Sequence, residues 1–146
     1  MREEGLVPIL SWTPLTDVRP IAAGPFRMPW HRVTDVIRGP THLLIAATGS
    51  WTAIPEVLAA CDPNGFAGLS LPPDRVVLPD APPGALIGRL GGSSASLKAD
   101  GAFPIGLDCV AQLPPNSVGL LFVSFNIVAR PVDVASFTIE VSTATI

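Results

Sequence analysis

The stretch "VSFNIVARPVDVASFTIEV", from Val123 to Val141, holds the pattern that decides the fold. At its start Val123 and Phe125 flank a serine, and at its end Phe137, Ile139 and Val141 alternate with polar residues. Alternation of apolar and polar residues with a period of two is typical of strands that bury one face. The sequence therefore predicts two β-strands here, joined by a short connector.

That connector is unusual because it is apolar. It contains Ile127, Val128, Val132 and Val134, with Asp133 as its one acid. Surface loops generally carry tight-turn residues or polar residues that bind or catalyse. Four aliphatic side chains exposed to water would form an uncommon apolar patch. We therefore expect the connector to lie in a protein–protein interface, the alternative being that two of the four side chains complete the core.

The rest of the chain repeats the strand signal. "RVTDVIRGPTHLLIAATGSW" (32–51) predicts a strand, a Gly-Pro turn and a central strand with two apolar faces. Further strands are predicted in 84–92, 102–126 and 136–146, with a turn at Pro114–Asn116. A long connection over 52–83 includes a turn at Asn64–Gly65 and at most a short strand from Arg75 to Leu78. Seven to nine short strands predict an all-β fold, an antiparallel β-sandwich of the jelly-roll-like type.

The N-terminal part has a different character. Five prolines punctuate "VPILSWTPLTDVRPIAAGPFRMP" (7–29), and no strand period is visible. We expect residues 1–29 to form an extended proline-rich arm that lies over the domain or over a neighbour. Residues 30–146 then form the sandwich domain. The 17 prolines of the whole chain also argue against helices.

Composition limits the partners. Only 14% of the residues are charged, whereas about a quarter is typical of soluble domains, so we expect copies of the chain or another protein to cover part of the surface. The net charge of −3 and the lack of a basic run argue against binding to nucleic acid or anionic membranes. No segment predicts membrane insertion, and "MREEG" (1–5) does not resemble a signal peptide. We expect synthesis in the cytoplasm and a final location in a particle or an extracellular assembly.

Catalytic motifs are missing from the sequence. There is no P-loop, no G-x-G-x-x-G after a strand and no G-x-S-x-G, so we do not expect an enzyme. His31 and His42 flank one predicted turn, but zinc requires three or four ligands, and we interpret them as surface histidines. The acids of the long connection, Asp62, Asp74 and Asp80, are consistent with a calcium cluster or with turn capping.

The tryptophans and the cysteines each allow two interpretations. The tryptophans Trp12, Trp30 and Trp51 fit either a sugar-stacking platform or core packing. Cys61 and Cys109 fit either one disulfide or two reduced, buried thiols.

Several stretches together resemble a known family. "RVTDVIRGPTHLLIAATGSW" (32–51) resembles the first two strands of the PA-IL (LecA) type of bacterial galactose lectins. "LPDAPPGALIGRLGG" (78–92) is similar to that family's strand reading G-A-L-I-G-x-I-G. "AFPIG", "VAQLPPNSVGLLFVSFN" and "SFTIEV" are similar to its last three strands. The resemblance spans roughly residues 30–142 and implies a small, lectin-like β-sandwich that is often oligomeric.

In those lectins the loop corresponding to 126–135 holds calcium, which in turn holds sugar hydroxyls. The resemblance implies that Asn126 matches a ligand, whereas Ile127 stands at an aspartate position and Ala135 at a glycine. The later polar pair falls near Val132 and Asp133. Calcium takes 6–8 oxygens, usually with several carboxylates, so calcium is not expected and no other cofactor is implied. Trp51, Asn126 and Asp133 are the candidate remnants of a sugar-binding side.

Two functions follow as expectations. The first is a non-enzymatic, self-associating structural subunit of a larger assembly, such as a phage particle, tail or filament. The second is a carbohydrate-binding lectin of the galactose-binding type, with a relocated or metal-independent site. The first implies a homo-oligomer or larger protein assembly as partner, and the second implies a glycan.

Overall fold

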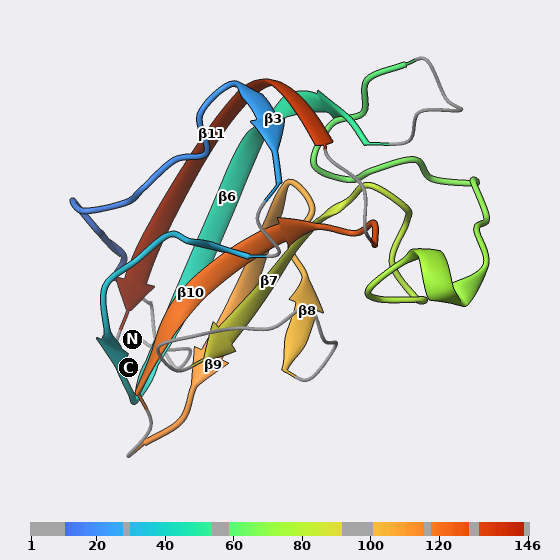
Figure 1. Cartoon of the computed structure of the whole chain (residues 1–146). Coiled ribbons are helices and arrows are strands. Elements are labelled where there is room, and N and C mark those ends of the chain that lie inside the picture. The colour runs from blue at the N-terminus through green and yellow to red at the C-terminus, as the bar shows by residue number, and fades with distance from the viewer. Residues whose placement is uncertain are drawn as a thin grey trace, which may run out of the picture.

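The computed structural model describes residues 11–27, 30–53, 59–91, 101–115, 118–128 and 132–144. In these residues the chain is all-β, and its only helix is a single 3-10 turn, η1 (Pro73–Arg75). Two antiparallel sheets pack against each other as a sandwich (Figure 1). The predicted fold class is therefore confirmed. The described residues include no helix with the length and apolar character needed to cross a membrane.

The first sheet is built around β10 (Val118–Phe125). Its strand order is β4 (His31–Arg32), β10, β7 (Leu86–Gly91) and β8 (Ala102–Pro104). A further short strand, β5 (Ile37–Arg38), pairs with the beginning of β10. Seven of the eight residues of β10 are buried, which explains its nearly continuous apolar sequence.

The second sheet is built around two long strands, β6 (Thr41–Thr52) and β11 (Val132–Ala144). Its order is β2 (Thr13–Pro14), β11, β6 and β9 (Asp108–Leu113), and β3 (Gly24–Phe26) also pairs with β11. The central position that the apolar faces of 41–51 predicted is confirmed, because β6 lies between β11 and β9 (Figure 1).

The ladder between β6 and β11 contains one irregularity. Its register shifts between Val134 and Ser136, which marks a β-bulge at Ala135. On the opposite strand Gly49 has a φ of +149°, and a Cβ there would collide with the Ser136 carbonyl oxygen. Glycine at position 49 thus lets the two strands stay paired across the bulge.

The N-terminal segment covers the edge of the second sheet. Within residues 11–27, β2 and β3 pair with β11, and Ile21 and Phe26 belong to the hydrophobic core. Of the two placements expected for the arm, these residues take the one over the domain itself. Residues 1–10 and 28–29 of the expected arm lie outside the described residues.

An aromatic cluster ties the two sheets together at one end of the sandwich. Phe125 of β10 contacts Phe26 with ring centroids 5.0 Å apart and Trp51 with centroids 4.6 Å apart, both edge-on. Trp51 also packs against Phe137 of β11 at 5.9 Å. Edge-to-face packing of this kind stabilises by about 0.5–1.5 kcal/mol per pair beyond simple burial.

The described residues of the long connection between β6 and β7 include the predicted turn. Gly65 has a φ of +75°, which confirms the Asn64–Gly65 turn. The sequence allowed at most a short strand from Arg75 to Leu78, and none forms there, since η1 ends at Arg75 and the following residues join no strand. The amides of Val77 and Leu78 bond to a side chain instead, as described below.

We predict that Phe26→Ala lowers the free energy of unfolding by about 3 kcal/mol, the lower end of the range for a buried phenylalanine. Phe26 is 9% exposed and packs on Phe125 from the N-terminal segment. Urea denaturation would measure the change, with the exposed neighbour Arg27→Ala as the control. A loss below about 1 kcal/mol, typical of a modest site, would contradict the integration of this segment into the core.

Candidate functional site

The connector singled out by the sequence begins where β10 ends. Asn126, Ile127 and Val128 follow Phe125, and β11 starts at Val132. Residues 129–131 lie outside the described part of the chain. The connector lies beside the long segment that joins β6 to β7 (Figure 1), since Val128 donates a backbone hydrogen bond to the Arg75 carbonyl at 2.9 Å.

Asn126 is fully buried, and its amide bonds to the main chain of the long connection. Its Oδ1 accepts hydrogen bonds from the N–H groups of Val77 at 2.9 Å and Leu78 at 2.7 Å. Its Nδ2 donates towards the carbonyls of Leu78 at 3.0 Å, Ala81 at 3.0 Å and Pro82 at 3.1 Å. Two amide hydrogens thus serve three acceptors, so the polar capacity of this side chain is used completely.

The backbone of Asn126 extends the same network. Its N–H donates to the Ala85 carbonyl at 2.8 Å, and its carbonyl accepts from the Gly84 N–H at 3.0 Å. The Gly84 carbonyl in turn accepts a hydrogen bond from Trp51 Nε1 at 2.8 Å. Gly84 has a φ of +79°, a conformation that side chains rarely adopt. Asn126 and Trp51 are therefore connected through Gly84 in one hydrogen-bond network.

The four aliphatic residues of the connector do not form an exposed patch. Ile127, Val132 and Val134 are 5%, 1% and 2% exposed and belong to the protein's own core. Val128 is half-buried and packs against a second cluster around Trp30. The expected interface at this loop is thus corrected: the strand pairings of β11 turn Val132 and Val134 inward, leaving too little apolar surface for a partner.

The expected sugar-side remnants are also placed differently from a binding site. Trp51 has no exposed surface, so its indole face cannot stack on a sugar. Asn126 is committed to the main chain. Asp133 is exposed within β11, where it pairs with Thr52 and Pro25. Of these three residues, Asp133 alone offers a solvent-exposed carboxylate. One carboxylate is too few for a calcium site of the usual kind.

The structure places each acid of the long connection separately. Asp62 Oδ1 accepts the Asn64 N–H at 2.8 Å, which confirms turn capping for this acid. Asp74 lies in the first turn of η1, and Asp80 is exposed. Among the described residues no group of three or more histidines, cysteines or acids is placed to hold a metal.

The structure also places the histidines, tryptophans and cysteines that the sequence singled out. His31 lies on β4 of the first sheet and His42 on β6 of the second, so they do not face each other across a hairpin. Trp30 is buried in the core, as Trp51 is, and Trp12 is half-buried.

The two cysteines are both free thiols. Cys61 is buried, and Cys109 is half-buried in β9. Burial, and after it the charge of the neighbouring Asp62 or Asp108, raises the pKa of each thiol to about 11.

The structure reveals a surface that the sequence reading missed, the outer edge of β9. In the described residues β9 pairs only with β6 and forms the border of the second sheet. Val110 is 59% exposed at the middle of this strand, and Leu107 is 42% exposed before it. The sequence predicted strands within 102–126, but nothing in it indicated that one of them lies at an edge.

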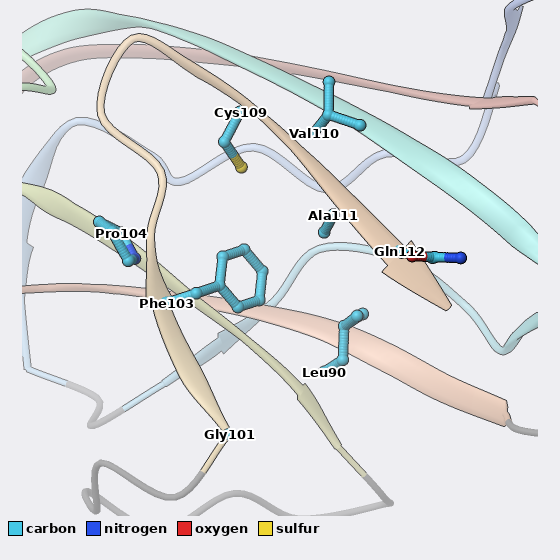
Figure 2. A pocket seen from close by; sticks show the side chains of 8 residues that line it. All are labelled: Leu90, Gly101, Phe103, Pro104, Cys109, Val110, Ala111 and Gln112. Atoms are coloured by element: carbon cyan, nitrogen blue, oxygen red, sulfur yellow. The ribbon is translucent and has the colours of Figure 1, made fainter. Parts of the chain in front are cut away.

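A cleft adjoins this edge. It has a volume of about 400 Å³ and opens between β7 and β8 of one sheet and β9 of the other (Figure 2). The side chains around it are mainly apolar: Leu90, Phe103, Pro104, Cys109, Val110 and Ala111, with the amide of Gln112. In the described part of the chain, the border of the sandwich thus combines a strand that is paired on one side with a neighbouring apolar hollow.

Comparison of the sequence with protein-family models finds no match. Comparison with curated proteins finds none either. The geometry of the chain itself therefore carries the functional argument.

We predict that Asn126→Ala lowers the free energy of unfolding by about 3 kcal/mol or more, because the amides of Val77 and Leu78 and three carbonyls lose their partner. Denaturant unfolding would measure this loss. Hydrogen exchange should show that the amides of Val77 and Leu78 lose protection first. The isosteric Asn126→Asp should also destabilise, because it replaces the donor with an oxygen that faces carbonyls.

Asp133→Asn is the matched control, since it changes an exposed residue of the same connector and should alter stability by less than about 0.5 kcal/mol. A stable Asn126→Ala protein with protected amides at Val77 and Leu78 would contradict the structural role of Asn126.

We also predict that millimolar calcium leaves the melting temperature unchanged. Calcium bound to the native state at 100 times its dissociation constant would add about 2.7 kcal/mol, a shift that calorimetry detects easily. Asn126 Oδ1 is already occupied by two N–H groups, and Asp133 stands alone as an acid. A rise in melting temperature that Asp133→Ala abolishes would overturn this expectation.

Proposed function

We propose that the protein is a non-enzymatic, self-associating β-sandwich that acts as a structural subunit of a larger assembly. The observation that carries the proposal is the outer edge of β9, which has no strand partner among the described residues and exposes Val110 at its centre. A strand at the border of a sheet presents free N–H and C=O groups that pair readily with another strand.

The residues of β9 themselves lack the features that usually prevent such pairing. Natural edge strands are protected by lysine, proline, bulges or charges that point inward. β9 contains no lysine, arginine or proline, and its ladder with β6 has no register shift. Its one charged residue, Asp108, stands at the beginning of the strand. An unprotected edge of this length is compatible with a working interface.

The composition supports the same function. With 14% charged residues, the surface has few of the charges that normally keep proteins apart. Other exposed aliphatic side chains, Val36 and Val118, lie near the β5–β10 pairing of the first sheet. They offer a second region of contact, which a multi-subunit assembly needs in addition to a pairwise one.

Carbohydrate binding has less support at the loop that the resemblance indicates. The indole of Trp51 and the amide of Asn126 are both enclosed. A relocated site would have to use an exposed aromatic face, and the cleft beside β9 offers the half-buried Phe103. Titration with galactose therefore serves as a competing outcome in the test below.

We predict that the mass of the wild-type protein, measured by sedimentation from low micromolar concentration upward, rises above that of a monomer. Association by mass action must depend on concentration. Calcium and chelator should give the same mass, and galactose should have no effect. A monomer at every concentration would contradict the proposal, and a galactose-dependent change in mass or melting temperature would favour the lectin alternative.

A further inference from the structure

We propose that two copies of the chain pair through β9, antiparallel and about a twofold axis that passes beside Val110. This inference rests on the proposed function and specifies its first interface. It commits to one occupant of the edge, a second copy of the same strand, and to one register.

The register with β6 determines which backbone groups point outward. Ala47 N–H donates to the Leu107 carbonyl at 2.8 Å, and the ladder continues with Ile45 opposite Cys109 and Leu43 opposite Ala111. Hydrogen-bonded and non-hydrogen-bonded pairs alternate in an antiparallel ladder. The N–H and C=O groups of the residues between them therefore point away from β6: those of Asp108, Val110 and Gln112.

One symmetric register uses all three of these residues. With the axis beside Val110, this residue faces its own copy, and Asp108 faces Gln112 of the second copy. Each of the three then exchanges both backbone bonds with its partner. An axis shifted by one residue towards Asp108 leaves Gln112 without a strand partner, and the opposite shift brings Asp108 against Pro114, which has no N–H.

The side chains suit the same arrangement. Leu44 lies opposite Val110 across the β6–β9 ladder, and residues directly opposite each other share one face of a sheet. Pairing about Val110 therefore aligns Leu44, Val110 and their two copies in one apolar row across the joined sheets. This row would cover the side chain of Val110, which is 59% exposed in the single chain.

Charge favours a second copy as the occupant. The two copies of Asp108 lie at opposite ends of the paired strands, each facing the neutral amide of Gln112. No like charges stand directly opposite each other, an arrangement that would destabilise a strand pair. Cys109 and Ala111 turn towards the cleft (Figure 2), so the pairing leaves the packing between the sheets unchanged.

Disulfide trapping tests the register directly. In a hydrogen-bonded antiparallel pair the Cα atoms lie about 5.5 Å apart, within the range that a disulfide spans. Val110→Cys, made in a Cys109→Ala background, should give a covalent dimer under mild oxidation. Asp108→Cys or Gln112→Cys alone should not, because each lies four residues, about 13 Å, from its own copy along the strand. A mixture of those two variants should cross-link.

Val110→Pro tests the hydrogen bonds in solution. Proline is tolerated on an edge strand whose N–H faces solvent, so the variant should fold, with a circular dichroism spectrum like that of the wild type. It removes two symmetry-related bonds, and the dimer dissociation constant should rise about 10- to 100-fold. Val110→Thr keeps the N–H and the branched side chain, and is the matched control with a smaller rise.

The outcomes separate the two claims. If the wild type associates, yet the cross-links fail and Val110→Pro associates normally, the β9 register is overturned while the proposed function stands. If the wild type remains a monomer, the proposed function fails, and the pairing fails with it. An unfolded Val110→Pro protein together with cross-linked Val110→Cys would still support the register, and cross-linking with the wrong partner would overturn it.

Discussion

The buried amide of Asn126 is the constraint on which the closed end of the sandwich depends. A buried asparagine is costly unless its donors and acceptors are paired, and here the main chain from Val77 to Pro82 supplies the partners. This fixes the connection between β6 and β7 against the end of β10. It also places the Gly84 carbonyl where the buried indole of Trp51 can donate to it at 2.8 Å. Asn126 and Trp51 thus join the two sheets to the longest connection.

The hydrogen bonds of Asn126 also bear on whether this loop can bind a ligand. At the position where the resembling galactose lectins hold calcium, the chain satisfies its own backbone, and Ile127 and Val132 complete the core. A side chain that closes the fold is not available for a ligand. The free hydrogen-bonding groups lie instead at the border of the second sheet, where β9 has one strand neighbour among the described residues. We therefore propose recognition at this edge rather than at the loop.

Much of the fold could be predicted, because periodicity reports local burial directly. The two apolar faces of 41–51 predicted the central position of β6, and the Asn64–Gly65 turn followed from its residue types. The site could not be predicted in the same way. Aliphatic residues at 127–134 suit an interface or a core equally, and only the pairing of β11 decides their direction. The partners of Asn126 lie more than 40 residues earlier in the chain, and the edge position of β9 depends on the order of all the strands.

Amide hydrogen exchange at several protein concentrations tests the central claim most directly, because it reports the Asn126 network and the β9 edge together. The account predicts that the amides of Val77 and Leu78 are protected at every concentration, since a side chain of the same molecule holds them. The amides of Val110 and Gln112 should exchange rapidly in dilute solution and become protected as concentration rises. Rapid exchange at Val110 at all concentrations, or protection of Val77 and Leu78 only at high concentration, would contradict it.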